Sequence, residues 1–215
     1  MTEDLRQSYE LTFRRCWEAR FFSHLDLMRG LMRMLRRTGL QVYFTEGFNP
    51  KPRVSYLTKP LSVGHTSECE RFGFMLVEQG DIGEIETALK KHIPSPLGFE
   101  SVGLLPSGRQ KDESELEYYI FIRRGHERMI EEALNRDVPG GVKELTREQI
   151  ESARVLYDHT DSAAMLDEYY NGGFVFNIDT GSGYRRPDRI LFPEAEIGPE
   201  VLFFHRKREL FNSSK

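Results

Sequence analysis

The sequence predicts an α+β fold made of two tandem ferredoxin-like units, each with the order β-α-β-β-α-β and an antiparallel sheet. The first observation is a succession of short alternating segments and segments of helical spacing that occurs twice along the 215 residues. The second is a polar segment at 107–115 without periodicity. We therefore expect an N-terminal domain at 1–106, a linker at 107–115 and a C-terminal domain at 116–215.

A capping box predicts the clearest element of the first half. Ser23 followed by Asp26 marks the start of an amphipathic helix, and Gly39 marks its end. Alternation predicts a strand before this helix, and helical spacing predicts a second helix at 82–92. The predicted strands are 9–17, 41–45, 53–57, 70–78 and 99–105.

The second half repeats the order with one addition. An insert at 138–152, whose 146–152 part has helical character, follows the first predicted helix. Pro187 suits the first turn of a short helix that reaches Leu191. The other predicted elements are strands at 116–123, 153–157, 173–179 and 201–208 and a helix at 126–135.

Positive charge is concentrated in the first half. Residues 14–59 carry ten Lys or Arg and three Asp or Glu, a local net charge of +7, whereas the whole chain carries −4. Arg29, Arg33 and Arg36 fall on the helix face opposite the apolar one, without balancing acids. This asymmetry indicates a surface that meets an anion. An ordinary solvated helix face is the alternative.

Two loops add candidate binding residues. Phe48 and Asn49 lie in a Gly-Phe-Asn-Pro turn beside Lys51 and Arg53, where the ring can stack on a base while the cations hold phosphate. The alternative is that Phe48 packs into the core. A glycine-rich loop at 181–183 precedes a second basic group, which offers an anion grip at a helix start or forms a plain surface loop. That group consists of Arg185, Arg186 and Arg189.

Catalytic patterns in the sequence are weak. The candidates are His24, Tyr43 and His65, which can act as general acid and base on a ribose 2′-hydroxyl only if they lie together. The sequence contains no metal-ligand spacing and no glycine-rich phosphate loop, so we expect neither a metal nor a cofactor. Cys16 and Cys69 are expected to be reduced thiols of a cytoplasmic protein, and no apolar run reaches the length of a membrane span.

Several ordered blocks resemble the radical-SAM-linked protein family, a domain of unknown function encoded beside or fused behind B12-binding-like radical S-adenosylmethionine enzymes. The blocks are Arg20-Phe21-Phe22-Ser23-His24-Leu25-Asp26-Leu27-Met28-Arg29, Glu46-Gly47-Phe48-Asn49-Pro50-Lys51-Pro52, Pro60-Leu61-Ser62-Val63-Gly64 with Ser67-Glu68, and Arg186-Pro187-Asp188-Arg189-Ile190-Leu191. His65 and Thr66 interrupt the usual run from glycine to Ser-Glu, and the insert departs from the pattern. The resemblance implies an accessory protein to a radical enzyme, with RNA as a candidate substrate.

The cysteine content agrees with an accessory role. A site-differentiated iron–sulfur cluster needs three thiolates, and the chain has two cysteines, so any radical step belongs to a partner. The sequence thus predicts a non-catalytic accessory or substrate-binding protein that recognises RNA through its basic helix and Phe48. Two alternatives stay open: a metal-independent endoribonuclease on the tandem ferredoxin-like scaffold, and a protein-docking subunit without nucleic-acid contact.

Overall fold

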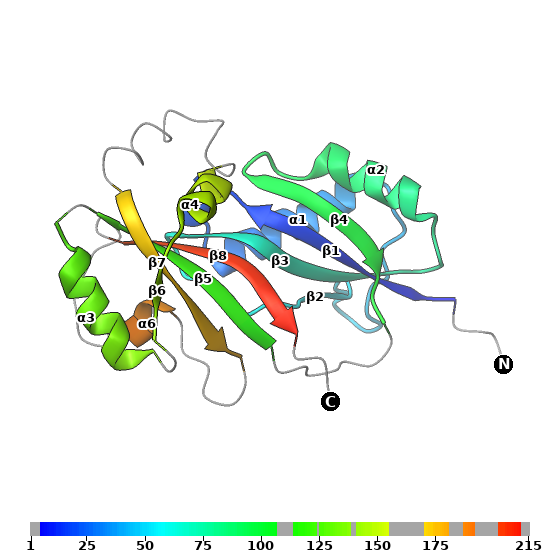
Figure 1. Ribbon diagram of the computed structural model, residues 1–215. Helices are drawn as coiled ribbons and strands as arrows, with labels where there is room; N and C mark the ends of the chain where they lie inside the picture. Colours follow the sequence, from blue (N-terminus) through cyan, green and yellow to red (C-terminus); the bar gives the residue numbers. More distant parts are fainter. Residues whose placement is uncertain are drawn as a thin grey trace. The chain divides into compact units, whose positions relative to one another are not determined.

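The computed structural model describes residues 5–106, 114–123, 125–138, 141–154, 170–180, 187–191 and 202–211. Its elements are β1 (Gln7–Arg15), η1 (Glu18–Phe21), α1 (His24–Arg37), β2 (Val54–Tyr56), β3 (His65–Leu76), α2 (Ile82–His92), β4 (Leu97–Leu104), β5 (Ser114–Arg123), α3 (Glu127–Asp137), β6 (Lys143–Glu144), α4 (Arg147–Arg154), β7 (Tyr170–Asp179), α6 (Pro187–Leu191) and β8 (Leu202–Phe211) (Figure 1). The fold is mixed α+β, and most strand pairs are antiparallel.

The chain forms two compact units that do not follow its halves. The first unit comprises Met1–Arg15, Phe22–Pro60 and Cys69–Lys111, and the second comprises Cys16–Phe21, Leu61–Glu68 and Asp112–Lys215. The division after Lys111 falls within the predicted linker, of which residues 107–113 lie outside the described part. Two short segments of the first half nevertheless belong to the second unit, which the predicted domains at 1–106 and 116–215 did not include.

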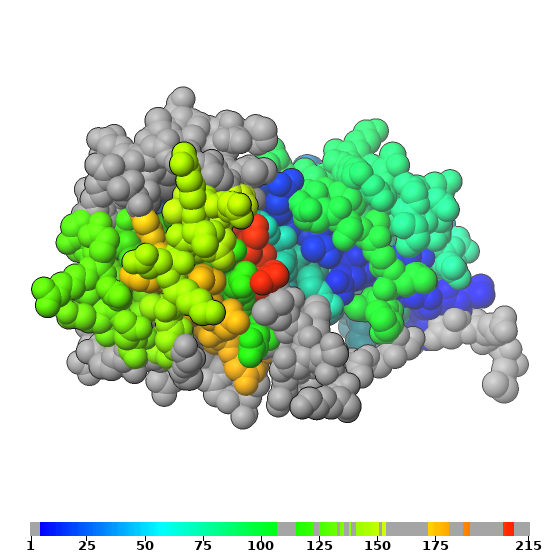
Figure 2. Space-filling view, in the orientation of Figure 1, coloured from blue at the N-terminus to red at the C-terminus, as the bar shows by residue number. Residues whose placement is uncertain are grey.

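In the first unit, β1 lies between β4 and β3, and β2 pairs with β3. Alternation in β1 turns Tyr9, Leu11 and Phe13 into the core, where the ring of Tyr9 stacks on that of Phe74 at 5.6 Å. From the side shown in Figure 2, α2 and β4 form most of the visible surface of this unit, with parts of β1 between them. The helices α1 and α2 contact each other.

The predicted capping box is present at the start of α1. The Ser23 hydroxyl accepts a hydrogen bond from the Asp26 amide at 3.1 Å and donates one to the Asp26 carboxylate at 2.6 Å. Gly39 has a φ of +76° immediately after the helix, a conformation that glycine adopts without strain. Leu31 is buried as predicted, whereas Met28 is only half-buried.

In the second unit, β5 lies between β8 and β7, and the two-residue strand β6 pairs with β7. The first residues of β3 join this sheet, because His65 to Ser67 pair in parallel with Phe204 to Arg206 of β8. Two first-half segments of the second unit, Cys16–Phe21 and Leu61–Glu68, also fill its core, and we call them the borrowed segments. Leu61 packs in the cluster that contains Tyr118 and Ile120, and Trp17 packs in a second cluster.

Several predicted boundaries need correction. The strand expected at 70–78 begins earlier, at His65, because a distant strand, β8, pairs with the backbone of residues 65–67. The strand expected at 41–45 consists of two isolated bridges, Val42 with Leu76 and Phe44 with Pro52. The strand expected at 153–157 is wrong at its start, because Ala153 is a buried residue of the helix α4. Residues 155–157 lie outside the described part. The helix predicted at 82–92 is confirmed.

Candidate nucleic-acid interface

The arginine row, defined as Arg29, Arg33 and Arg36, lies exposed on α1. Burial of the opposite apolar face fixes this orientation, since Leu31 and its apolar neighbours on α1 are almost fully buried. Arg29 reaches the exposed Asp26 at 3.5 Å, a distance at which such a pair contributes little. Arg33 and Arg36 form no ion pair with any carboxylate of a described residue. The row therefore presents guanidinium groups to solvent.

Three other arginines of the basic stretch make contacts within the protein. Arg14 lies 2.5 Å from Glu100, and the buried Arg15 donates to the carbonyl of Phe22. The guanidinium of Arg20 lies 3.4 Å from the centroid of the Trp17 ring, which is a cation–π contact. The structure therefore divides the +7 stretch into structural cations and exposed ones.

The Phe48 loop, residues 47–53, projects an apolar ring into solvent. The relative exposure of Phe48 is 113%, and Asn49, Lys51 and Arg53 are also exposed. Burying a phenylalanine side chain would stabilise the protein by roughly 1.5–3 kcal/mol, which this position forgoes. The alternative in which Phe48 packs into the core is therefore wrong.

Hydrogen bonds hold the ends of this loop together. The Thr45 amide donates to the Lys51 carbonyl at 2.8 Å, and the Lys51 amide donates to the Thr45 hydroxyl at 3.1 Å. Farther along, the Arg53 amide donates to the Tyr43 carbonyl at 2.8 Å. Gly47 has a φ of +121°, which only glycine adopts readily. The exposed ring is thus carried by a closed hairpin.

A hollow of about 620 Å³ lies at the base of the Phe48 loop, and we call it the loop-base pocket. Residues from the start of β1, the two loop ends and Met75 of β3 line it. Two of the lining residues, Arg6 and Tyr43, contact each other. The Nη1 atom of Arg6 donates to the Tyr43 hydroxyl at 2.9 Å, and the guanidinium carbon lies 4.8 Å from the centre of the Tyr43 ring. This pocket joins segments that are far apart in the sequence, and the sequence analysis did not find it.

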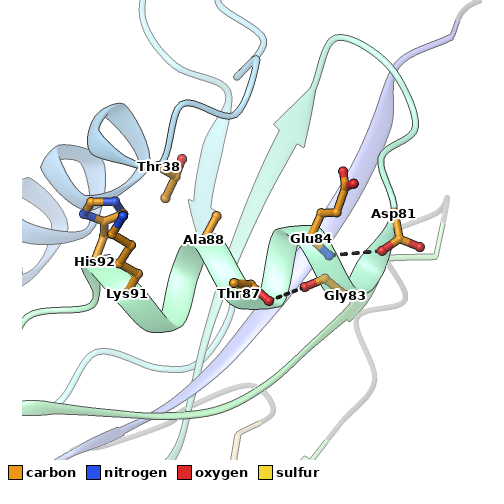
Figure 3. Close-up of a pocket in the computed structure, with 8 residues that line it drawn as sticks. All are labelled: Thr38, Asp81, Gly83, Glu84, Thr87, Ala88, Lys91 and His92. Carbon is orange, nitrogen blue, oxygen red and sulfur yellow. Dashed lines mark hydrogen bonds between the residues drawn. The ribbon is translucent and has the colours of Figure 1, made fainter.

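A second hollow, of about 650 Å³, lies beside α2 near the end of α1 (Figure 3). Two of its polar side chains form hydrogen bonds within the α2 segment itself. Asp81 accepts from the Glu84 amide at 3.0 Å as the N-cap, and Thr87 donates to the Gly83 carbonyl at 2.8 Å (Figure 3). We therefore interpret this hollow as a groove formed by helix ends.

The three catalytic candidates do not form a described contact with one another. His24 packs edge-on against Tyr56 at 4.9 Å, and Tyr43 accepts from Arg6. His65 belongs to the second unit, where it is 3% exposed and stacks on Phe204 at 4.6 Å. The structure therefore offers no acid and base pair built from these residues.

A buried chain of hydrogen bonds in the second unit escaped the sequence analysis. The Thr66 hydroxyl lies 2.9 Å from Nδ1 of His205, and Nε2 of His205 lies 3.1 Å from Oε1 of Glu68. Lys207 donates to both carboxylate oxygens of Glu68, at 2.9 and 2.7 Å. More than 130 residues separate the partners in sequence, so no local pattern could reveal them.

Burial determines the charge state of this chain of groups. It lowers the pKa of His205, which is therefore neutral at pH 7. Burial also raises the pKa of Glu68, but the hydrogen bonds from His205 and Lys207 and the charge of Lys207 outweigh this effect, so the pKa is lowered. Hydroxyl, imidazole and carboxylate follow the order of a hydrolase triad. Because Thr66 and His205 are 0% exposed, no substrate reaches the hydroxyl, and we interpret the chain as structural.

The predicted second basic group is only partly described. Arg189 is exposed on α6, whereas Arg185 and Arg186 lie outside the described residues. Asp188 accepts a hydrogen bond from the Ser62 hydroxyl at 3.1 Å. This bond connects two of the sequence blocks that carry the family resemblance, and it lies within the second unit.

Two features are absent from the described residues. Among them, no group of three or more His, Cys, Asp or Glu is placed to hold a metal ion. No described helix combines the length and the apolar character needed to cross a membrane.

The comparisons with known proteins show a family and solved structures that match the chain. The family described as "Uncharacterized protein conserved in bacteria (DUF2344)" matches residues 8–161. No curated protein matches the chain. The chain is similar to a protein titled "Crystal Structure of an Unknown Protein from Galdieria sulphuraria", with 10% identity, coverage of 81% of this chain and 98% of that chain, and a TM-score of 0.29. A TM-score this low does not establish a shared fold.

Proposed function

The chain belongs to the family described as an uncharacterized protein conserved in bacteria (DUF2344), and we propose that it is a non-catalytic protein that binds RNA. The binding groups are the arginine row of α1 and the Phe48 loop, both in the first unit. The exposed basic group at Arg189 is a further candidate contact.

The exposed Phe48 carries this proposal. A ring held in water by a closed hairpin, with Lys51 and Arg53 exposed on the same loop, has the composition of a base-stacking platform with phosphate contacts. Stacking suits unpaired bases, because the faces of paired bases are covered by their neighbours. We therefore propose single-stranded RNA as the ligand.

The charge distribution favours an anionic ligand over a neutral protein surface. Among the described residues, Arg33 and Arg36 have no acidic partner and Arg29 has only the exposed Asp26, so the guanidinium groups of the row can replace the counterions of a phosphate backbone. A protein-docking subunit would need a partner with matching carboxylates, and no described feature of α1 distinguishes that case from RNA. The experiment below separates the two.

We also propose that each unit is a ferredoxin-like domain. The interleaving of the strands supports this, since β1 lies between β3 and β4 in the first unit and β5 lies between β7 and β8 in the second. The second unit carries an additional helix, α4, between β6 and β7. Antiparallel sheets of this kind are covered by helices on one face and leave the other available to a partner.

The partnership with a radical S-adenosylmethionine enzyme stays a proposal supported by the sequence resemblance. The family description names no partner. The two cysteines of the chain, Cys16 and Cys69, are too few for a site-differentiated cluster of its own. In this proposal the chain presents RNA, and the enzyme carries out the radical step.

The test is fluorescence anisotropy of a labelled oligouridine of about a dozen nucleotides, within the usual site sizes, titrated over a series of salt concentrations. We expect the Arg33→Ala/Arg36→Ala variant to weaken binding and to flatten the logarithmic salt slope by about 1.4, since each lost phosphate contact of a single strand removes about 0.7. Phe48→Ala should weaken binding by about tenfold or more, with little change in the salt slope.

The matched control is Lys143→Ala/Arg147→Ala, which removes the same charge from exposed positions of the second unit. It should leave the slope unchanged if the contacts are local. Circular dichroism and thermal melting should show that each variant is folded. A chain that shows no salt-dependent RNA affinity, yet copurifies with a radical S-adenosylmethionine enzyme, would contradict RNA binding and leave the docking alternative.

A further inference from the structure

The loop-base pocket has the charge and size of a site for a small anion-bearing ligand. Its charged lining residues are Arg6, Arg53 and Glu46. Its volume of about 620 Å³ lies within the usual range of ligand sites, roughly 300–1,000 Å³. A positive balance with a single carboxylate fits a ligand that carries both phosphate oxygens and hydrogen-bond donors.

The hydroxyl groups of the pocket have donor capacity to spare. The Tyr43 hydroxyl already accepts from Arg6, and the Thr45 hydroxyl already accepts from the Lys51 amide. Each hydroxyl also has one proton to donate, and no described residue accepts it. These protons, together with the Ser8 hydroxyl, give the pocket neutral donors beside its two guanidinium groups.

The apolar part of the lining suits a sugar or base. Tyr43, with an aromatic ring, and Met75, with a thioether side chain, are among the lining residues. The Glu46 carboxylate can accept hydrogen bonds from ribose hydroxyls or from an exocyclic amine. The same carboxylate repels a bare phosphate, so it favours a ligand in which phosphate is joined to donors.

The pocket is continuous with the Phe48 loop. Thr45 and Glu46 directly precede the loop, Arg53 ends it, and all three line the pocket. An RNA strand that stacks one base on Phe48 would therefore place a neighbouring nucleotide beside the pocket.

We propose that the loop-base pocket binds one nucleotide, a phosphorylated nucleoside, adjacent to the base that stacks on Phe48. The inference rests on the proposed RNA binding and assigns a specific position in the ligand. Arg6 and Arg53 hold the phosphate, Glu46 accepts from the ribose or base, and the Tyr43 hydroxyl donates to the ligand.

The test is isothermal titration calorimetry of the full chain with 5′-AMP, adenosine and inorganic phosphate as separate probes. We expect 5′-AMP to bind at least about tenfold more tightly than adenosine or phosphate, because only 5′-AMP engages both kinds of group. Arg6→Ala should weaken 5′-AMP by about tenfold or more and Tyr43→Phe by a smaller factor, since a charged partner contributes more than a neutral hydroxyl. Glu46→Gln should reduce the preference for 5′-AMP over phosphate.

The control is Arg33→Ala, which lies on α1 and does not line the pocket. This variant should weaken RNA binding and leave the affinity for 5′-AMP unchanged. RNA binding that 5′-AMP does not compete with, and that Arg6→Ala leaves intact, would overturn the pocket assignment while the proposed RNA binding stands. Binding of 5′-AMP that Arg6→Ala abolishes, in a chain without RNA affinity, would support the pocket and overturn RNA binding.

Discussion

His205 is a titratable residue buried in the second unit. It is 0% exposed and is hydrogen-bonded to Thr66 and Glu68, with the Tyr119 ring 6.0 Å from its own and with Lys207 on the same carboxylate. A neutral imidazole satisfies both neighbours, accepting from the threonine hydroxyl and donating to the carboxylate. Protonation would reverse the first of these hydrogen bonds, because Nδ1 would then donate to the threonine oxygen, and it would place a charge in the core.

The stability of the protein should therefore fall as the pH falls through 6.5. Burial holds the pKa of His205 below its ordinary 6.5 in the folded chain, whereas the unfolded chain has the ordinary value. The unfolded state then binds more protons below pH 6.5, and the free energy of unfolding declines by up to about 1.4 kcal/mol per pH unit from this residue. Urea unfolding followed by circular dichroism between pH 7 and pH 5 measures this pH dependence of the free energy of unfolding.

The comparison protein for this measurement is His205→Gln, whose amide can hydrogen-bond both neighbours without titrating in this range. Its unfolding free energy should depend less on pH than that of the wild type. Parallel pH profiles of the two proteins would show that His205 is not the titrating group. If His205→Gln does not fold, Glu68→Gln offers a second comparison, because it removes the carboxylate that faces Nε2.

At the level of single elements, one glycine within α1 and one just after it differ in backbone conformation. Gly30 lies within the helix, and a Cβ atom added there would meet nothing within 4 Å. Gly39 follows the helix with a φ of +76°, and a Cβ atom there would also lie in open space. Sterically the two sites are alike, and only the backbone conformation differs.

Gly30→Ala should raise the free energy of unfolding by about 0.5–1 kcal/mol, because alanine favours the helix and restricts the unfolded chain. Gly39→Ala should lower it by roughly 1–2 kcal/mol, because a left-handed conformation strains a residue with a Cβ atom. Thermal melting of the two variants beside the wild type checks both signs. Equal shifts in one direction would contradict the account.

Local patterns in the sequence were sufficient to predict the helices. Ser23, Asp26 and Gly39 lie within one helix length of one another, and the structure confirms α1 on their basis. The arginine row followed from the same periodicity. The start of β3 could not be predicted in this way, because the partner of His65 is Phe204 in β8.

The same limit applied to the candidate site. The exposure of Phe48 was one of two open alternatives, and only the folded loop decided between them. The loop-base pocket needs Arg6, Arg53 and Met75 together, and these come from three separate segments. Residues brought together by tertiary structure leave no spacing in the sequence for a pattern to detect.

For the whole molecule, the borrowed segments make the second unit dependent on the N-terminal sequence. Trp17 packs with Tyr119 and Phe121, and Leu61 packs with the cluster that contains Tyr118. A fragment that contains only residues 112–215 lacks both side chains and the β3 partner of β8. Its core is incomplete.

We expect the 112–215 fragment to lack a cooperative unfolding transition, whereas the full chain should show one for the second unit. Trp17 is the single tryptophan, so its fluorescence reports on the second unit although it lies early in the sequence. Urea titration followed by this fluorescence in the full chain, and by circular dichroism in the fragment, provides the measurement. A fragment that unfolds cooperatively with the stability of the full chain would contradict the dependence.

The borrowed segments also affect the order of events on the ribosome. Synthesis runs from the N-terminus, so Leu61 emerges before Leu116, the first member of its cluster in β5. At bacterial rates the delay is roughly 3–10 s, which is long compared with the formation of a helix or hairpin. During that interval Trp17 and Leu61 are apolar groups without their native neighbours, and the nascent chain is a candidate client for chaperones that bind exposed apolar segments.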